Sequence, residues 1–255
     1  MRFPKINIRR EIKLFLLLIL AFSAIAFVDR KQDSKKIQEL NILIHDKGNN
    51  YFLSKEEVHK LITADNSDFV LGNDYGQVDL KTIENRVKQN EYVFSTQAFK
   101  DLAGNLTVEI ELCKPMARII RPGKGDKYIC ESGKIISTNA KYTPRVLLVG
   151  GDYLKEVDSG NIAADSAYQR VYQLTRFIHQ DPFWKAQIAQ MNINKQGDIT
   201  LYPQVTRQYI EFGKPVNIED KFLKLEYFYK KILPYKGWNH YARVNLKYEN
   251  QIICE

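Results

Sequence analysis

The sequence is poor in the residues that build metal centres and disulfide frameworks. Its three cysteines, Cys113, Cys130 and Cys254, stand far apart and form no C-x-x-C pair, and its four histidines lack the spacing of metal ligands. We therefore expect no metal site and no cofactor. Cys113 and Cys130 are able to bridge in an oxidising compartment, and the alternative is that they are buried free thiols in strands.

Catalytic motifs are also missing. The sequence contains no G-x-S-x-G, no H-E-x-x-H and no S-x-x-K with its partner motifs. The G-K-G at 123–125 lacks the spacing of a phosphate-binding loop, so we interpret it as a turn. Glu109 and Glu111 lie two apart in one expected strand, which is typical of a solvated strand face rather than of a general acid and base. We expect no catalytic residues, no enzyme activity and no small-molecule substrate.

The charge does not favour binding to nucleic acid. The chain has a formal net charge of +8, but residues 1–13 alone hold five basic residues against one acid. The remaining 242 residues hold 33 basic and 29 acidic residues, a modest excess over that length. We therefore expect no nucleic-acid partner, and we interpret the basic N-terminus as a signal of membrane topology.

The chain has one long apolar run at 12–28, which reads IKLFLLLILAFSAIAFV. A helix of this length measures roughly 25 Å, the short end of what spans a bilayer. The basic residues before it predict an N-terminus that stays in the cytoplasm. The alternative is a cleaved secretory signal, because Ala24 and Ala26 form an A-x-A pattern. The absence of a helix breaker or a polar segment at the end of the run favours a retained anchor.

Residues 37–121, after a polar linker, predict one compact unit of strand, helix, helix, strand and strand. Ser54 and Glu57 have the S-x-x-E spacing of a capping box, which begins the first helix. The expected elements are a strand at 37–44, a helix from Ser54, a second helix near 80–89 and strands at 91–99 and 105–112.

Residues 122–255 predict a second unit that is richer in strands. Gly133 and Gly197 mark the turns of two hairpins. The expected elements are hairpins at 127–137 and 186–204, strands at 145–151 and 207–214, helices at 161–180 and about 217–233, and two final strands in YARVNLKYE and QIIC. We find no internal repeat and no low-complexity tract.

Several short motifs occur in a fixed order. FLSKEEVHKLI and IENRVKQNEYVFSTQAFKDLAGNLTVEIELCKPMARI match a POTRA domain, and Tyr128–Gly133 matches a Y-I-D-x-x-G hairpin. Three more segments of the same pattern follow in the second unit, namely VLLVG, FGKPVNIEDKFLKLEYFYKKILP and ARVNLKYENQIIC. Together these motifs resemble the FtsQ/DivIB family of bitopic cell-division proteins, in particular its Bacteroidetes-type members. The chain departs from the family at Leu112–Pro115, where E-R-x-P is usual, and at Cys130, where the hairpin has Asp.

The resemblance implies an α+β fold class. A single N-terminal transmembrane helix is followed by a POTRA domain of β-α-α-β-β order and by a mixed α/β "β-domain" with a mostly antiparallel sheet. The implied division is a cytoplasmic tail at 1–11, a transmembrane helix at 12–28, a linker at 29–36, a POTRA domain at 37–121 and an FtsQ-type β-domain at 122–255.

The resemblance also implies a function without catalysis. Members of the family are scaffolds of the division machinery, which recruit FtsB-like and FtsL-like proteins and help to control septal peptidoglycan synthesis. The implied location is the inner (cytoplasmic) membrane at the division septum, with the N-terminus in the cytoplasm and the C-terminal domains in the periplasm. The alternative is a POTRA-containing component of envelope transport or assembly. That alternative predicts repeated POTRA units or a β-barrel pattern, and neither is visible in the sequence.

In the family, FtsB is held by β-augmentation at the edge of the last strand of the β-domain. We expect no later strand to cover this edge, and Ile252 and Ile253 give a strand pattern of their own close to Glu255. The alternative is that this strand merely finishes the sheet. Carried onto this sequence, the partner-binding residues are Tyr248, Asn250, Gln251, Ile252 and Cys254.

Overall fold

The computed structural model describes most of the chain, namely residues 12–23, 35–45, 50–101 and 103–255. Within the membrane span expected at 12–28, residues 12–23 form a helix whose side chains are exposed. Residues 24–28, the tail at 1–11 and most of the linker lie outside the described residues. Within the described residues, no helix combines the length and the apolar character needed to cross a bilayer.

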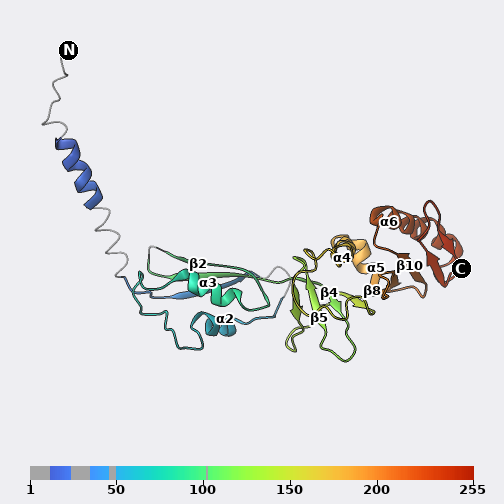
Figure 1. Cartoon of the computed structure of the whole chain (residues 1–255), viewed down its shortest axis with the longest axis horizontal. Coiled ribbons are helices and arrows are strands. Elements are labelled where there is room, and N and C mark those ends of the chain that lie inside the picture. The colour runs from blue at the N-terminus through green and yellow to red at the C-terminus, as the bar shows by residue number, and fades with distance from the viewer. Residues whose placement is uncertain (1–11, 24–34, 46–49, 102) are drawn as a thin grey trace, which may run out of the picture. The chain divides into compact units, whose positions relative to one another are not determined.

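The chain divides into two compact units (Figure 1). Met1–Asp46 and Leu53–Glu111 make the first unit, and Lys47–Phe52 and Leu112–Glu255 make the second. The boundary expected after residue 121 assigned Pro115–Ile119 to the first unit, whereas these residues form strand β4 of the second unit's sheet. The sequence hides this boundary because only Cys113 and Lys114 separate the two apolar strands on either side.

The first unit is a sheet of three strands with two helices, in the expected order β-α-α-β-β. Its elements are β1 (Leu40–His45), α2 (Lys55–Ile62), α3 (Leu80–Lys88), β2 (Val93–Lys100) and β3 (Leu106–Leu112). Strand β3 lies at the centre and pairs in parallel with β1. Val108 and Ile110 are fully buried, whereas Glu109 and Glu111 lie on the more exposed face, as the alternation predicts.

Local hydrogen bonds explain where these elements begin and turn. The predicted capping box is confirmed: Ser54 Oγ accepts from the N–H of Glu57 at 3.2 Å, and Glu57 Oε2 accepts from the N–H of Ser54 at 3.0 Å. In the turn before β3, the Asp101 carboxylate accepts from the N–H groups of Gly104 at 2.9 Å and Asn105 at 2.8 Å. These backbone donors lower the pKa of Asp101, because they stabilise the ionised form.

The second unit is built on a sheet of nine strands. In chain order they are β4 (Pro115–Ile119), β5 (Lys127–Cys130), β6 (Ile135–Ser137), β7 (Leu147–Gly150), β8 (Ile188–Ile193), β9 (Ile199–Pro203), β10 (Tyr209–Gly213), β11 (Arg243–Asn245) and β12 (Ile253–Cys254). In space their order is β12-β11-β10-β9-β8-β7-β4-β5-β6. Three pairings are parallel (β4–β7, β7–β8 and β10–β11) and the other five are antiparallel, so the sheet is mostly antiparallel as expected.

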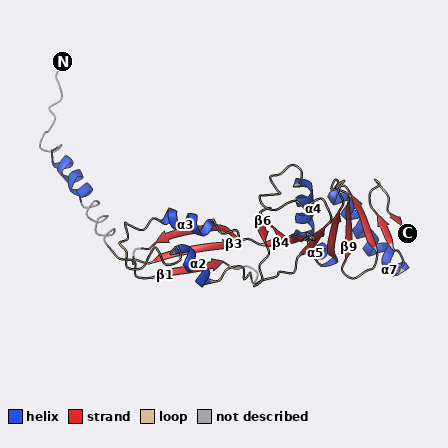
Figure 2. Cartoon of the chain, turned by 60° about the horizontal axis from the view of Figure 1, so that its bottom comes forward, coloured by secondary structure: helices blue, strands red, loops and turns tan. Residues whose placement is uncertain are grey.

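Helices pack on one face of this sheet (Figure 2). They are α4 (Gln169–Gln180), α5 (Pro182–Gln187), α6 (Ile218–Tyr227), a π-helical turn (Phe228–Ile232) and α7 (Leu233–Lys236). Leu174 and Leu225 are fully buried in the core that they form with the strands. The helix expected at 161–180 begins only at Gln169, because Asp165 binds the N–H of Ala167 at 2.9 Å and holds the preceding residues in turns.

A short segment between two elements of the first unit belongs to the second. Phe52 is 0% exposed, and its ring centroid lies 5.0 Å from that of Tyr142 and 5.8 Å from that of Tyr128. Asn139 Nδ2 donates to the carbonyl of Phe52 at 3.2 Å, and Asn50 Nδ2 donates to the carbonyl of Cys113 at 2.7 Å. The chain therefore enters the second unit twice.

Candidate partner-binding edge

Strand β12 is the last strand at one end of the nine-stranded sheet. It pairs antiparallel with β11, with Cys254 opposite Val244 and Ile253 opposite Asn245. Strand β11 in turn pairs in parallel with β10. Within the residues that the structure describes, no strand lies beyond β12, and Figure 2 shows the C-terminal strand at this end of the unit.

Backbone hydrogen bonds show which groups of β12 face outward. Arg243 and Glu255 exchange two hydrogen bonds, each with an N···O distance of 3.0 Å. In an antiparallel pair, such bonded pairs alternate with pairs that exchange no hydrogen bond, so Cys254 and Val244 form a non-bonded pair. The N–H and C=O of Cys254 therefore point away from β11.

The residues predicted to bind a partner lie in two different settings. Ile252 and Cys254 are half-buried and pack against the core. Tyr248, which is 51% exposed, and the exposed Asn250 and Gln251 belong to the bend and turn before β12. Asn250 has a φ of 58°, a left-handed conformation that asparagine tolerates better than most residues. The structure thus brings all of them to one end of the sheet, but only Cys254 lies within a strand.

The strand expected at 241–249 is much shorter in the structure. Only Arg243–Asn245 are in strand conformation, and the chain turns away from the sheet before Tyr248. The apolar residues that suggested a longer strand have another role: Leu246 is fully buried in the core, while Tyr248 is exposed. Alternation alone does not distinguish a strand from an extended segment that leaves the sheet.

A charged network that the sequence did not reveal holds this end of the sheet together. Arg243 on β11 binds Glu211 on β10 through two hydrogen bonds, of 2.9 Å from Nε and 3.0 Å from Nη2. Arg243 Nη1 also binds Glu255 at 2.9 Å, and Lys247 Nζ lies 3.1 Å from Glu211. The hydrogen bonds from Arg243 lower the pKa of Glu211. Sequence reasoning missed this network because Arg243 and Glu211 are 32 residues apart.

Two lysines of helix α6 bind carbonyls of neighbouring segments: Lys224 binds the turn before β12, and Lys221 binds the end of β10 and the residue after it. Lys224 Nζ donates to the carbonyl of Tyr248 at 2.7 Å. Lys221 is buried and donates to the carbonyls of Phe212 at 2.7 Å and Lys214 at 2.8 Å. Burial, with a smaller effect from the charge of Lys224, lowers the pKa of Lys221 to about 8. A cavity of about 610 Å³ lies between α6 and this turn.

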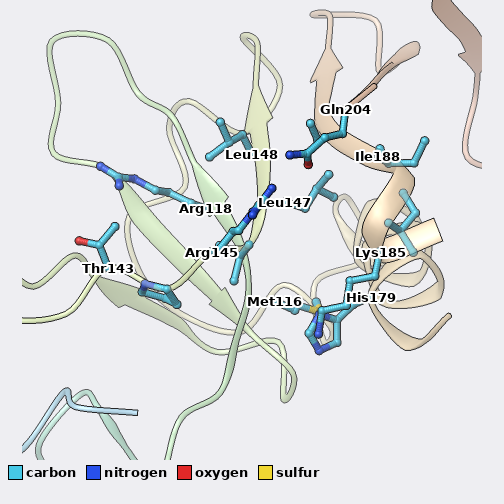
Figure 3. Close-up of a pocket in the computed structure, with 14 residues that line it drawn as sticks. Met116, Arg118, Thr143, Arg145, Leu147, Leu148, His179, Lys185, Ile188 and Gln204 are labelled. Carbon is cyan, nitrogen blue, oxygen red and sulfur yellow. The ribbon is translucent and has the colours of Figure 1, made fainter. Parts of the chain in front are cut away.

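A second cavity, of about 340 Å³, lies at the N-terminal ends of β7 and β8 (Figure 3). Arg118, Arg145, His179 and Lys185 are the basic side chains that line it, and no acidic side chain does. Arg118 already binds Asp126, at 2.7 Å, and His179 already binds Glu131, at 3.0 Å. Arg145 and Lys185 are exposed, which is typical of an ordinary solvated rim.

Chemical groups for catalysis do not converge around the edge or the cavities described above. In the part of the chain that the structure describes, no three His, Cys, Asp or Glu residues form a group that could hold a metal ion. His45 and Glu109, 3.5 Å apart, form an isolated pair on the first unit's sheet. What the end of the sheet offers is a row of backbone donors and acceptors beside exposed side chains, which is the chemistry of strand addition.

Two family models match the chain, and together they cover nearly all of the described residues. One, described as FtsQ/DivIB, C-terminal related, matches residues 114–255. The other, described as a POTRA-like domain, matches residues 35–111. The two matches meet between β3 and β4, where the two compact units also meet. A comparison with curated proteins found no match.

Proposed function

The chain belongs to the FtsQ/DivIB family of cell-division proteins, and we propose that it is a membrane-anchored scaffold of the bacterial division machinery. In this role it recruits FtsB-like and FtsL-like partners, and by holding them it helps to control septal peptidoglycan synthesis. The scaffold acts through protein–protein contacts and performs no catalysis of its own.

The observation that carries this proposal is the open edge of β12. Cys254 directs its N–H and C=O away from the sheet, because its neighbour Glu255 exchanges both backbone hydrogen bonds with Arg243. A partner strand added there gains backbone hydrogen bonds along its length, while Tyr248, Asn250 and Gln251 supply contacts that depend on the partner's side chains. Strand β12 has only two residues, and such a short edge discourages pairing with unrelated strands.

The edge is also prepared for binding before a partner arrives. The bidentate pair of Arg243 and Glu211 ties β11 to β10, and the contact of Arg243 with Glu255 ties the end of the chain to β11. A surface that is already ordered loses less conformational entropy on binding. This supports recognition by a preformed strand edge.

The proposal includes a membrane anchor at 12–28, with the N-terminus in the cytoplasm and both units in the periplasm. The apolar run and the basic residues before it support this topology. A fluorescent fusion to the full chain is expected to give a band at mid-cell, in the inner membrane at the septum. A uniform envelope signal would contradict the proposal and favour a POTRA-containing component of envelope transport or assembly.

Co-purification of the FtsB-like partner tests the proposed edge. We expect the full chain to retain the partner and a chain that ends at Lys247 to lose it. Ile252→Lys is a less direct test than this truncation, because Ile252 packs against the core and the substitution also disturbs that packing. If the shortened chain retains the partner as well as the full chain does, the site lies elsewhere.

A further inference from the structure

The two buried cysteines of the second unit lie side by side. Cys113 is 2% exposed and precedes β4, and Cys130 is 1% exposed and ends β5. Strands β4 and β5 are antiparallel neighbours, with Pro115 opposite Cys130, and the N–H of Glu131 donates to the carbonyl of Lys114 at 2.8 Å. This register brings the two thiols into hydrogen-bonding contact.

The third cysteine is far from this pair. Cys254 lies in β12 at one end of the sheet, and six strands separate β12 from β5. Seven inter-strand spacings of about 4.8 Å make the distance across the sheet roughly 34 Å. In the folded unit Cys254 is therefore too far away to bond to either thiol, so only a bond between Cys113 and Cys130 is compatible with the native sheet.

We propose that Cys113 and Cys130 form an intramolecular disulfide that ties the start of β4 to the end of β5 when the chain folds in an oxidising compartment. The proposal rests on the proposed function only for that location. None of the three cysteines is part of a disulfide in the structure. The backbone can adjust to the bond, because the β4–β5 register is already shifted between Pro115 and Ala117 and the ladder is not continuous there.

The oxidant is a disulfide donor, either an oxidised dithiol protein or glutathione disulfide. The thiolate of one cysteine attacks the donor, a mixed disulfide forms, and one donor thiolate leaves. The thiolate of the second cysteine then attacks the protein sulfur of the mixed disulfide, the Cys113–Cys130 bond forms, and the second donor thiolate leaves. Two protein thiols lose two electrons, the donor disulfide gains them, and the two protons pass to the donor thiolates.

The bond must form before the core closes. The reactive species is the thiolate, and both the hydrogen bond with Cys113 and burial raise the pKa of Cys130. The buried pair in the folded unit is also shielded from a donor. Oxidation during folding is therefore expected to be at least tenfold faster than oxidation of the folded, reduced protein.

Refolding of the full chain in detergent tests the proposal. Reduced, denatured protein is refolded with glutathione disulfide, and the remaining thiols are alkylated in denaturant. We expect the protein to lose the mass of two hydrogen atoms and to carry one alkylated thiol. After digestion with trypsin, which does not cut at Lys114 because Pro115 follows, we expect a linked pair of peptides covering 101–118 and 128–134. Three alkylated thiols, or a bond that includes Cys254, would overturn the proposal.

Two comparisons make the result decisive. Cys254→Ser is expected to keep the linked peptides, and Cys113→Ser is expected to lose them. Since Cys113→Ser can also impair folding, the melting temperatures of oxidised and reduced wild-type protein are compared as well. We expect the bond to raise the melting temperature by roughly 5–10 °C, and an equal or lower value would show that the native fold does not accommodate it. Refolding involves no partner, so failure to form the disulfide would not bear on the proposal that a partner binds at the edge of β12.

Discussion

One substitution separates the backbone of the β12 edge from its side chains. Cys254→Pro removes the N–H that points out of the sheet, and Cys254→Ala keeps that N–H while it removes the same thiol. The pairing of β12 with β11 uses the backbone groups of Ile253 and Glu255, so neither substitution breaks it. Proline is tolerated at an edge-strand position whose N–H faces outward.

The expected loss can be worked out from hydrogen bonds. Binding to Cys254→Pro lacks one backbone hydrogen bond, which contributes about 1 kcal/mol net. It also leaves a carbonyl of the partner strand without a donor in the interface, which costs about another 1 kcal/mol or more. A loss of about 2 kcal/mol corresponds to a roughly 30-fold weaker Kd. For Cys254→Ala we expect a change within about threefold, because the half-buried thiol faces the core.

The assay is titration of the full chain, in detergent, with the purified FtsB-like partner. Thermal unfolding of both variants checks that the sheet is intact. Equal affinity of Cys254→Pro and Cys254→Ala would refute strand addition at this edge. A loss of affinity in both variants would show that the side chain of Cys254, rather than its backbone, contacts the partner.

Three further predictions concern stability and are checked by denaturant unfolding. Gly151→Ala is expected to lower the free energy of unfolding by at least about 2 kcal/mol more than Gly123→Ala does. Both glycines have positive φ, but an added Cβ would lie 2.1 Å from the backbone oxygen of Ile193 at Gly151 and in open space at Gly123. Equal losses would rule out the steric reason. Lys221 has a pKa of about 8 in the folded protein against an ordinary 10.5, so between these values the unfolded chain binds more protons than the folded protein. The contribution of Lys221 therefore makes the free energy of unfolding rise from pH 8 to 10.5. Lys221→Met is expected to remove this rise, which amounts to at most about 3 kcal/mol. If the free energy of unfolding depends on pH in the same way in the variant, the prediction is wrong. Ser54→Ala is expected to cost about 1 kcal/mol through loss of the capping box, and no change would mean that another group caps α2.

Local signals in the sequence predicted most of the secondary structure. The S-x-x-E spacing located the start of α2, and the turns at Gly133 and Gly197 have φ values of 83° and 80°, where glycine is favoured. These features depend on residues a few positions apart, so a single sequence contains them. The alternation in β3 was read correctly for the same reason.

Features that depend on distant residues were not predicted. The place of Phe52 in the second unit was not predicted, because its ring packs on Tyr128 and Tyr142, which are far away in the sequence. The boundary between the units was placed too late, because β4 continues the apolar pattern of β3. Apolar spacing indicates that a segment is buried, but it does not indicate which unit buries it.

The sequence predicted that the last strand lies at an edge of the sheet, but it did not predict the contacts that hold this edge. The resemblance and the final apolar residues located the edge, and the position of β12 at one end of the sheet agrees with that location. Binding at this edge stays a prediction. The pairing of Arg243 with Glu211 and the burial of Lys221 were missed, because charged residues normally indicate an exposed surface and their partners lie on other elements.

The double entry of the chain into the second unit limits how the protein can be dissected. A fragment that begins at Leu112 follows the domain boundary, yet it omits Phe52 and leaves the space beside Tyr128 and Tyr142 unfilled. Removal of a buried phenylalanine side chain costs about 3–5 kcal/mol, a large part of the stability of a typical domain. Truncation studies of the C-terminal half therefore need the residues around Phe52 supplied, for example as a separate peptide, before weak binding by a fragment is attributed to a missing interface.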